Sequence, residues 1–187
     1  MPLEIERRFL PRSPDWRPEG ECVPITQGYL KTGENAVVRA VRWPWPHLML
    51  NNERVAWLEW KDIFDITPHI TPEGYLPAEW KIRIRCYFDI RYVLDIKGPR
   101  SGTTRFELDE IQLDPKTGEQ LLQQCKGTVL RKKRYVLPYI GHAWQVDVYE
   151  GQHAGLVTCE VELRSATSIV KLPPWVGEEI TDRKLFG

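Results

Sequence analysis

Alternation of apolar and polar residues recurs along most of the chain. Residues 81–86 have the sequence KIRIRC, which places Arg83 and Arg85 on one side and Ile82 and Ile84 on the other. A period of two is typical of a β-strand, in which successive side chains point to opposite faces. The same pattern predicts strands at residues 3–10, 92–97, 104–111, 130–136, 144–149 and 158–163.

Short turn-forming segments separate these strands. Examples are Gly98-Pro99-Arg100-Ser101-Gly102 and the stretch from Glu150 to Gly155. Connections this short favour hairpins and therefore an antiparallel sheet. Helical pattern is scarce: one short helix is predicted from Lys116 to Cys125, with Gly127 near its end, and another at residues 165–172 before two prolines. The sequence therefore predicts a mainly β (α+β) protein.

Residues 43–80 differ from the rest of the chain. They contain prolines, no clean alternation and five of the eight tryptophans: Trp43, Trp45, Trp57, Trp60 and Trp80. A segment of this length is too short for an independent core, so we predict a single domain, residues 1–187, with an insertion at 43–80. Its aromatic residues would suit either a cover over the outer face of the sheet, or a lid or a contact in a homodimer.

Charged residues of like sign occur in pairs two positions apart. Such pairs are Glu4 with Glu6, Glu160 with Glu162, Arg83 with Arg85, and Lys132 with Arg134. The two members of a pair share one face of a strand, about 6.6–6.8 Å apart. They could lie on the solvated side of a half-buried sheet. However, a solvated face more often mixes charges with neutral polar residues, so ions of opposite charge between the pairs explain them better.

A sheet that closes on itself with these faces inward would enclose both kinds of charge. Such an interior must be hydrated and occupied by ions, because unpaired buried charge is very costly. Guanidinium and ammonium groups bind phosphate oxygens, and carboxylate pairs bind hard divalent cations. The pattern therefore indicates a site for a polyphosphate and a divalent metal ion.

Overall composition narrows the function classes. Lys and Arg number 26 and so do Asp and Glu, and this zero formal charge argues against a nucleic-acid-binding protein. No stretch approaches the roughly 20 apolar residues that span a bilayer, and MPLEIERRFL lacks the apolar core of a signal peptide. The four cysteines form no C-x-x-C pair. We expect a cytoplasmic protein with reduced thiols and no membrane or nucleic-acid partner.

Several blocks resemble the CYTH-domain proteins, the triphosphate tunnel metalloenzymes. Glu4-Ile5-Glu6-Arg7-Arg8-Phe9 is similar to the E-x-E-x-K signature that opens the family, with Arg8 where the signature usually has Lys. Further matching blocks follow in the family's order: residues 25–30, 83–85, 94–99, 105–111, 132–135, 146–149, 154–163 and 174–181. The resemblance covers the chain apart from about residues 43–80. It implies an eight-stranded closed antiparallel β-barrel with a few short helices packed outside.

The resemblance also implies roles for individual residues. Members of the family hydrolyse inorganic tripolyphosphate or a small organic triphosphate with Mg²⁺ or Mn²⁺. The expected catalytic residues are Glu4, Glu6, Arg8 and Lys97. The expected phosphate-binding residues are Arg8, Arg83, Arg85, Lys97, Arg105, Lys132 and Arg134. The expected metal ligands are Glu4, Glu6, Glu107, Asp109, Asp147, Glu160 and Glu162.

Two other functions are compatible with the same residues. Relatives of this kind include adenylyl cyclases, which act on ATP, but no motif for adenine recognition is evident. A polyphosphate-binding module without catalysis is the other alternative. Acidic pairs on separate strands favour an enzyme, because a protein that only binds anions would bind them better without those carboxylates.

Overall fold

The chain is almost entirely β-structure. The computed structural model describes residues 2–17, 21–39, 47–50, 53–125, 127 and 129–183. Its strands are β1 (Leu3–Pro11), β2 (Val23–Arg39), β3 (His47–Leu50), β4 (Glu53–Trp57), β5 (Tyr75–Tyr87), β6 (Arg91–Lys97), β7 (Thr104–Gln112), β8 (Leu130–Tyr139), β9 (His142–Tyr149), β10 (Val157–Glu162) and β11 (Val176–Glu179). The seven strands expected from alternation are confirmed, most with ends extended by a few residues.

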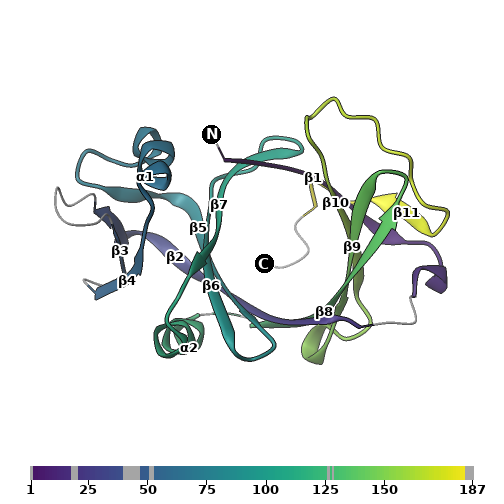
Figure 1. Cartoon of the computed structure of the whole chain (residues 1–187), viewed down its shortest axis with the longest axis horizontal. Coiled ribbons are helices and arrows are strands. Elements are labelled where there is room, and N and C mark those ends of the chain that lie inside the picture. Colours follow the sequence, from purple (N-terminus) through teal and green to yellow (C-terminus); the bar gives the residue numbers. More distant parts are fainter. Residues whose placement is uncertain are drawn as a thin grey trace. The chain divides into compact units, whose positions relative to one another are not determined.

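The strands pair in the order β4-β3-β2-β5-β6-β7-β1-β10-β9-β8, and β2 also pairs with β8 (Figure 1). Because of this second pairing, the eight strands from β2 to β8 form a closed antiparallel β-barrel, as the resemblance implied. The remaining strands extend this sheet: β3 and β4 continue from β2, and β11 pairs with β1.

Two short α-helices accompany the strands in the described ranges. Helix α1 spans Trp60–Ile66 and α2 spans Pro115–Gln124, while three-residue 3-10 turns lie at Pro14–Trp16, Thr67–His69 and Gly151–His153. Helix α2 confirms the helix predicted near Lys116: Pro115 occupies its first turn, and the Asp114 side chain accepts a hydrogen bond from the Thr117 amide at 3.0 Å. No helix of the described residues is long and apolar enough to cross a membrane.

The helix predicted at residues 165–172 is wrong. Only turns and bends occur there. The Ser165 amide donates to the Ser168 hydroxyl at 3.1 Å, and the Ser168 amide donates to the Ser165 carbonyl at 3.1 Å. These local hydrogen bonds of serine compete with those of a helix.

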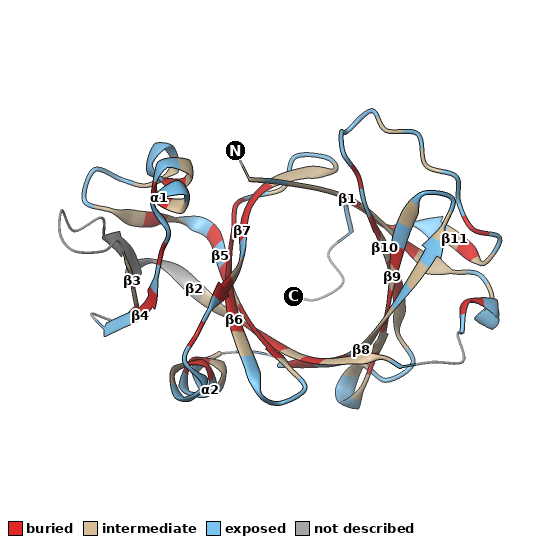
Figure 2. Ribbon diagram, viewed as in Figure 1, coloured by how far each residue is buried: buried red, intermediate tan, exposed pale blue. Residues whose placement is uncertain are grey.

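The chain divides into two compact units. The first consists of residues 1–2, 26–99 and 106–129. Its core contains the apolar positions of β5, β6 and β7, among them Ile82, Ile84, Leu94 and Ile96, together with Leu121 of α2. The charged positions that alternate with these residues therefore share the opposite face of the sheet. Figure 2 shows the buried residues concentrated along β5, β6 and β7.

The second unit consists of residues 3–25, 100–105 and 130–187. Its core contains Phe9, Trp144, Val146 and Val161, all buried, with the Phe9 and Trp144 ring centroids 5.6 Å apart. These residues alternate along β1, β9 and β10 with charged or polar ones. The same division into an apolar and a charged face therefore holds in this unit.

The described part of the predicted insertion forms β3, β4, α1 and the beginning of β5. Ile63, Ile66 and Trp80 join the core of the first unit, as expected of a segment that covers the apolar face. Phe64 of α1 remains 75% exposed. Trp43 and Trp45 lie outside the described residues.

Gly118 provides a test of the packing of α2 on β6. A Cβ atom at this position would lie 2.3 Å from the Tyr92 Cβ, which is closer than two such atoms can approach. We expect Gly118→Ala to lower the free energy of unfolding by about 1–3 kcal/mol, because overpacking forces the helix away from the strand. Urea denaturation measures this. The exposed Gln120→Ala on the same helix is the control, and an equal loss in both variants would contradict the close approach.

Candidate functional site

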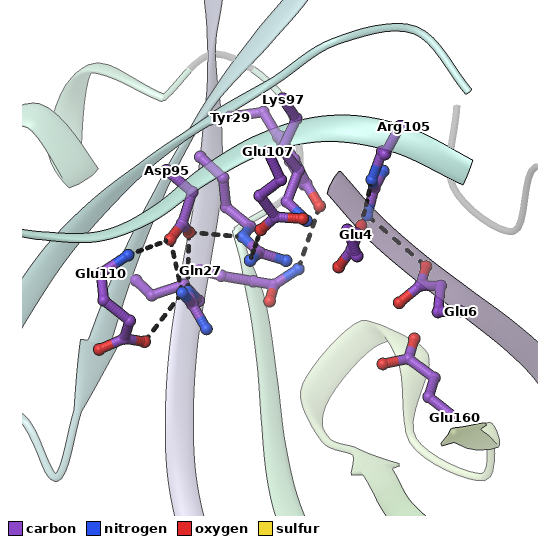
Figure 3. Close-up of polar contacts among 12 residues, drawn as sticks. Glu4, Glu6, Gln27, Tyr29, Asp95, Lys97, Arg105, Glu107, Glu110 and Glu160 are labelled. Atoms are coloured by element: carbon purple, nitrogen blue, oxygen red, sulfur yellow. Dashed lines mark hydrogen bonds and ion pairs between the residues drawn. The ribbon is translucent and has the colours of Figure 1, made fainter. Parts of the chain in front are cut away.

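A buried carboxylate, Asp95, organises the charged face of the first unit. It lies on β6 directly opposite Arg83 of β5 and is completely buried. Oδ2 of Asp95 accepts hydrogen bonds from Nε of Arg83 and Nε of Arg85, both at 2.8 Å. Oδ1 accepts from Nη2 of Arg85 at 2.5 Å and from the Glu110 amide at 3.0 Å. Both oxygens are therefore fully used within the protein (Figure 3).

The two arginines raise the acidity of Asp95. Burial alone raises the pKa of its carboxyl, but the guanidinium groups of Arg83 and Arg85 oppose this and lower the pKa to about 2. Asp95 is therefore ionised at neutral pH, and its charge offsets the two cations that stand two residues apart on β5. This neutralisation makes the buried arginine pair tolerable.

Lys97 and Glu107 form a second ion pair on the same face. Nζ of Lys97 donates to Oε2 of Glu107 at 2.5 Å, and the Lys97 side chain is almost fully buried. Oε1 of Glu107 accepts from Nη2 of Arg83 at 3.0 Å. Glu107, an expected metal ligand, is thus placed between two of the expected phosphate-binding cations.

A β-bulge lies in β7 beside this cluster. The pairing of β6 with β7 shifts between Leu94 and Ile96, so that two residues of β7, Asp109 and Glu110, stand opposite Asp95. Glu110 has a positive φ of 57°, and its carboxylate lies against Arg85 (2.9 Å) and the Tyr87 hydroxyl (2.9 Å). Asp109, expected as a metal ligand, is exposed beside this bulge.

In the second unit, two carboxylates of β1 lie against two arginines. Nε of Arg105 donates to Glu4, and Nη2 of Arg100 donates to Glu6. Nη2 of Arg105 also lies 3.6 Å from Oε1 of Glu6. Glu4 and Glu6 therefore lie close together, and Arg105, expected to bind phosphate, is a counter-ion of Glu4 in this structure.

Glu6 experiences an excess of negative charge. Its side chain is buried, and burial raises the pKa of its carboxyl, as do the nearby carboxylates of Glu160 and Glu4; Arg105 and Arg100 only partly offset this. Figure 3 shows the Glu160 carboxylate turned toward that of Glu6. A site that brings three carboxylates together at this cost would gain from a bound cation.

A third ion cluster lies on β8, β9 and β10 of the second unit. Asp147, completely buried, accepts from Nζ of Lys132 at 2.6 Å and from Nε and Nη2 of Arg134 at 2.7 Å each. Nη2 of Arg134 also donates to Glu160 at 3.2 Å. Asp147, expected as a metal ligand, is thus held by two expected phosphate-binding residues.

Burial and neighbouring charges shift the pKa values of Asp147 and Lys132 in this cluster. Burial raises the pKa of the Asp147 carboxyl, but Lys132 and Arg134 hold it well below its usual range. Burial lowers the pKa of the Lys132 ammonium; Asp147 opposes this, whereas Arg134 adds to it. Glu160 also raises the pKa of Lys132, but burial prevails, so an additional anion would stabilise the protonated lysine.

Arg8 and Glu162 lie on the same face of the sheet as Glu6. Nη2 of Arg8 donates to the carbonyls of Thr181 and Arg183, each at 3.1 Å, while its buried Nε has no hydrogen-bond partner among the described residues. Glu162 stands opposite Glu6 in the pairing of β1 with β10, and is exposed. An anion that reached Arg8 could accept a hydrogen bond from Nε.

The donor chemistry of Glu4, Glu6 and Glu160 suits a hard divalent cation such as Mg²⁺ or Mn²⁺. Within the described ranges, no group of three or more His, Cys, Asp or Glu residues is arranged as a ready metal site. Arg100 and Arg105 supply positive charge to Glu4 and Glu6 instead. The residues therefore fit a cation in chemistry and in charge, and the two arginines would compete with it.

Three residues of these clusters were not expected from the sequence: Asp95, Arg100 and Glu110. Alternation placed Asp95 and Lys97 on one face of their strand, so the role of Asp95 could have been suspected from its position opposite Arg83. Arg100 lies between two strands, where alternation does not predict which way a side chain points. Glu110 turns toward Arg85 only because of the bulge.

The low pKa of Asp95 has a consequence for acid stability. The pKa of Asp95 in the folded protein, about 2, lies below the ordinary value of 3.8. The ionised carboxylate therefore stabilises the folded protein fully above pH 3.8, and this stabilisation is lost as the pH falls through about 2. We expect Asp95→Asn to remove about 2 kcal/mol of pH-dependent stability. Urea unfolding of both proteins between about pH 5 and pH 2 measures this. Parallel pH curves for the two proteins would contradict it.

Comparison with known proteins identifies the family. No family model matches the chain. An inorganic triphosphatase of Acetivibrio thermocellus is 32% identical over 112 residues, which cover 58% of this chain and 70% of that protein. An inorganic triphosphatase of Nitrosomonas europaea is 28% identical over 189 residues, which cover 98% of this chain and 92% of that protein. The crystal structure of an inorganic triphosphatase aligns over 97% of this chain and 91% of its own, with 25% identity and a TM-score of 0.48.

The relative from Acetivibrio thermocellus shows the class of this protein, that of the triphosphate tunnel proteins, and the closed antiparallel barrel agrees with it. The chain therefore belongs to the CYTH, or triphosphate tunnel metalloenzyme, family.

Proposed function

We propose that this protein hydrolyses a triphosphate, with inorganic tripolyphosphate as the preferred substrate, and that it requires Mg²⁺ or Mn²⁺. One observation carries the proposal: two pairs of cations, Arg83 with Arg85 and Lys132 with Arg134, are each held by one buried aspartate, in a protein that also places Glu4, Glu6 and Glu160 together. The names of the sequence relatives support the same activity.

In this proposal the cations bind the phosphate groups. Arg83, Lys97, Lys132 and Arg134 supply hydrogen-bond donors and positive charge to the phosphate oxygens, and Arg8, Arg85 and Arg105 add to the positive field. All four of the first group are buried or nearly so, so their charges act in a medium that screens them weakly. Their ion pairs with Asp95, Glu107 and Asp147 hold the side chains in place before substrate binds.

Glu4, Glu6 and Glu160 would hold the divalent cation, with Glu162 on the same face. When bound, such a cation polarises phosphoryl oxygens and neutralises the charge that develops during transfer. The carboxylates would also orient the cation relative to the substrate. Arg100 and Arg105, which pair with Glu6 and Glu4, would be released from these carboxylates and become available to the phosphates.

A direct assay tests the proposed reaction. The purified protein is incubated with tripolyphosphate, ATP or thiamine triphosphate, each with Mg²⁺ or Mn²⁺, and released phosphate is measured. We expect turnover of tripolyphosphate to exceed that of the two organic triphosphates. Formation of cyclic AMP from ATP would instead indicate an adenylyl cyclase. Calorimetric binding of tripolyphosphate with no turnover under any metal would indicate a binding module.

A further inference from the structure

The two arginines that share Asp95 differ in how their donors are used. Arg85 donates to both oxygens of Asp95 and, through Nη1, to the Tyr87 hydroxyl, and its Nη2 lies 2.9 Å from Glu110. All three of its nitrogens therefore have partners. Arg83 uses Nε for Asp95 and Nη2 for Glu107, whereas its Nη1 makes no hydrogen bond or ion pair among the described residues. Arg83 thus keeps both N–H groups of Nη1 for a ligand, whereas each nitrogen of Arg85 already donates within the protein.

Asp95 is well placed to impose this division. Its two oxygens accept four hydrogen bonds, which leaves no lone pair for a metal ion or a substrate group. The backbone amide of Glu110, held at the bulge, fixes the carboxylate plane from the side of β7. The carboxylate in turn fixes the Nε edge of Arg83, and Glu107 fixes Nη2. These two contacts together fix the orientation of Nη1, the remaining nitrogen of the Arg83 guanidinium.

We propose that Asp95 is a positioning residue for triphosphate binding: it orients Arg83 so that Nη1 donates to a phosphate oxygen, and it holds Arg85 as a structural counterpart. This inference rests on the proposed function and adds to it a residue that touches neither substrate nor metal. The lowered pKa of the Asp95 carboxyl agrees with this role, because the group stays ionised at neutral pH.

The same arrangement occurs independently in the second unit. Asp147 lies opposite Arg134 in the pairing of β8 with β9, as Asp95 lies opposite Arg83 in the pairing of β5 with β6. In both hairpins one completely buried aspartate holds two cations that stand two residues apart on the neighbouring strand. Because the arrangement occurs twice in one chain, we infer that the buried aspartates serve to orient the cations.

Charge and orientation give opposite expectations for Asp95→Asn, which makes the variant informative. The substitution removes a negative charge next to the arginines, so charge alone would strengthen the attraction of a polyanion and lower the KM for tripolyphosphate. Loss of orientation would raise it. We expect KM to rise about tenfold or more, with kcat changed far less, because a charge-assisted hydrogen bond to the substrate is lost. A KM that falls or stays the same in a folded variant would overturn the inference.

Two further variants keep the test valid if Asp95→Asn fails to fold. Arg83→Lys retains the charge but loses the oriented edge, and we expect a similar rise in KM. Where both single variants fold, Asp95→Asn on the Arg83→Lys background should raise KM no further, because the aspartate acts through the arginine. Tyr87→Phe is the matched control: it removes a partner of Arg85 but none of Arg83, so KM should stay within about twofold. A normal KM in Arg83→Lys, or additive effects, would overturn the inference.

Calorimetry with tripolyphosphate separates this inference from the proposed function. If the wild-type protein binds tripolyphosphate but does not hydrolyse it, the proposed function fails, and the Kd values of the same variants still decide the role of Asp95. If the wild-type protein neither binds nor hydrolyses it, both fail. An active wild-type enzyme whose Asp95→Asn variant keeps its KM and Kd and loses only thermal stability overturns the inference alone.

Discussion

Replacing Glu6 by Gln is expected to reduce the turnover of tripolyphosphate at least about 100-fold while leaving the protein as stable as before, or more so. The loss of activity follows from removing one carboxylate of the set formed with Glu4 and Glu160. The effect on stability follows from the raised pKa of Glu6: burial and two neighbouring carboxylates disfavour its charged form at neutral pH, so a neutral amide of the same shape relieves that cost. Phosphate release and thermal denaturation measure the two effects.

Glu178→Gln is the control for this prediction. Glu178 lies on β11, pairs with Arg183 and is exposed, so neither turnover nor stability should change appreciably. Near-normal turnover in Glu6→Gln would contradict the proposed metal role of β1. A large loss of stability in Glu6→Gln would instead show that its ion pairs with Arg100 and Arg105 outweigh the repulsion.

Replacing Asp147 by Ala is expected to lower the free energy of unfolding by about 3–5 kcal/mol. The substitution leaves the buried cations Lys132 and Arg134 without their shared counter-ion, and Lys132 is the more affected because its ammonium has only Asp147 as a hydrogen-bond partner among the described residues. Urea denaturation at neutral pH measures the loss. It should be accompanied by a further fall in the pKa of Lys132, since burial and Arg134 would then act unopposed by Asp147.

Gln145→Ala on the same strand and face is the matched control, with an expected loss of about 1 kcal/mol or less. If Asp147→Ala and Gln145→Ala destabilise the protein equally, the cluster on β8 and β9 does not hold its cations in the manner described. Asp147→Asn, which keeps one acceptor oxygen and the side-chain shape, should fall between the two.

The strands and their two faces were predictable because a half-buried sheet imposes a period of two on its sequence. Arg83 and Arg85 share a face with Asp95, and Lys132 and Arg134 with Asp147, as the alternation requires. The departures have local causes that a period cannot express. The bulge inserts one residue into β7, so that Leu108 and Ile111 both take the apolar face and the Glu110 carboxylate reaches Arg85.

The counter-ions were harder to predict than the cations. Like-charged pairs on single strands suggested a bound polyphosphate, but the sequence did not show that buried aspartates on neighbouring strands already neutralise much of that charge. Strand pairing brings Asp95 to Arg83, and pairing depends on the register of two segments that local sequence does not specify. Arg100, in the turn before β7, reaches Glu6 only through the tertiary fold.

The requirement for a divalent cation is the most direct test of the proposed chemistry. The purified enzyme is treated with a chelator, and phosphate release from tripolyphosphate is followed before and after Mg²⁺ or Mn²⁺ is added back. We expect no release in the chelator, recovery with either ion, and no recovery in Glu6→Gln. Hydrolysis that continues at the same rate in the chelator would show that Glu4, Glu6 and Glu160 do not serve a metal ion.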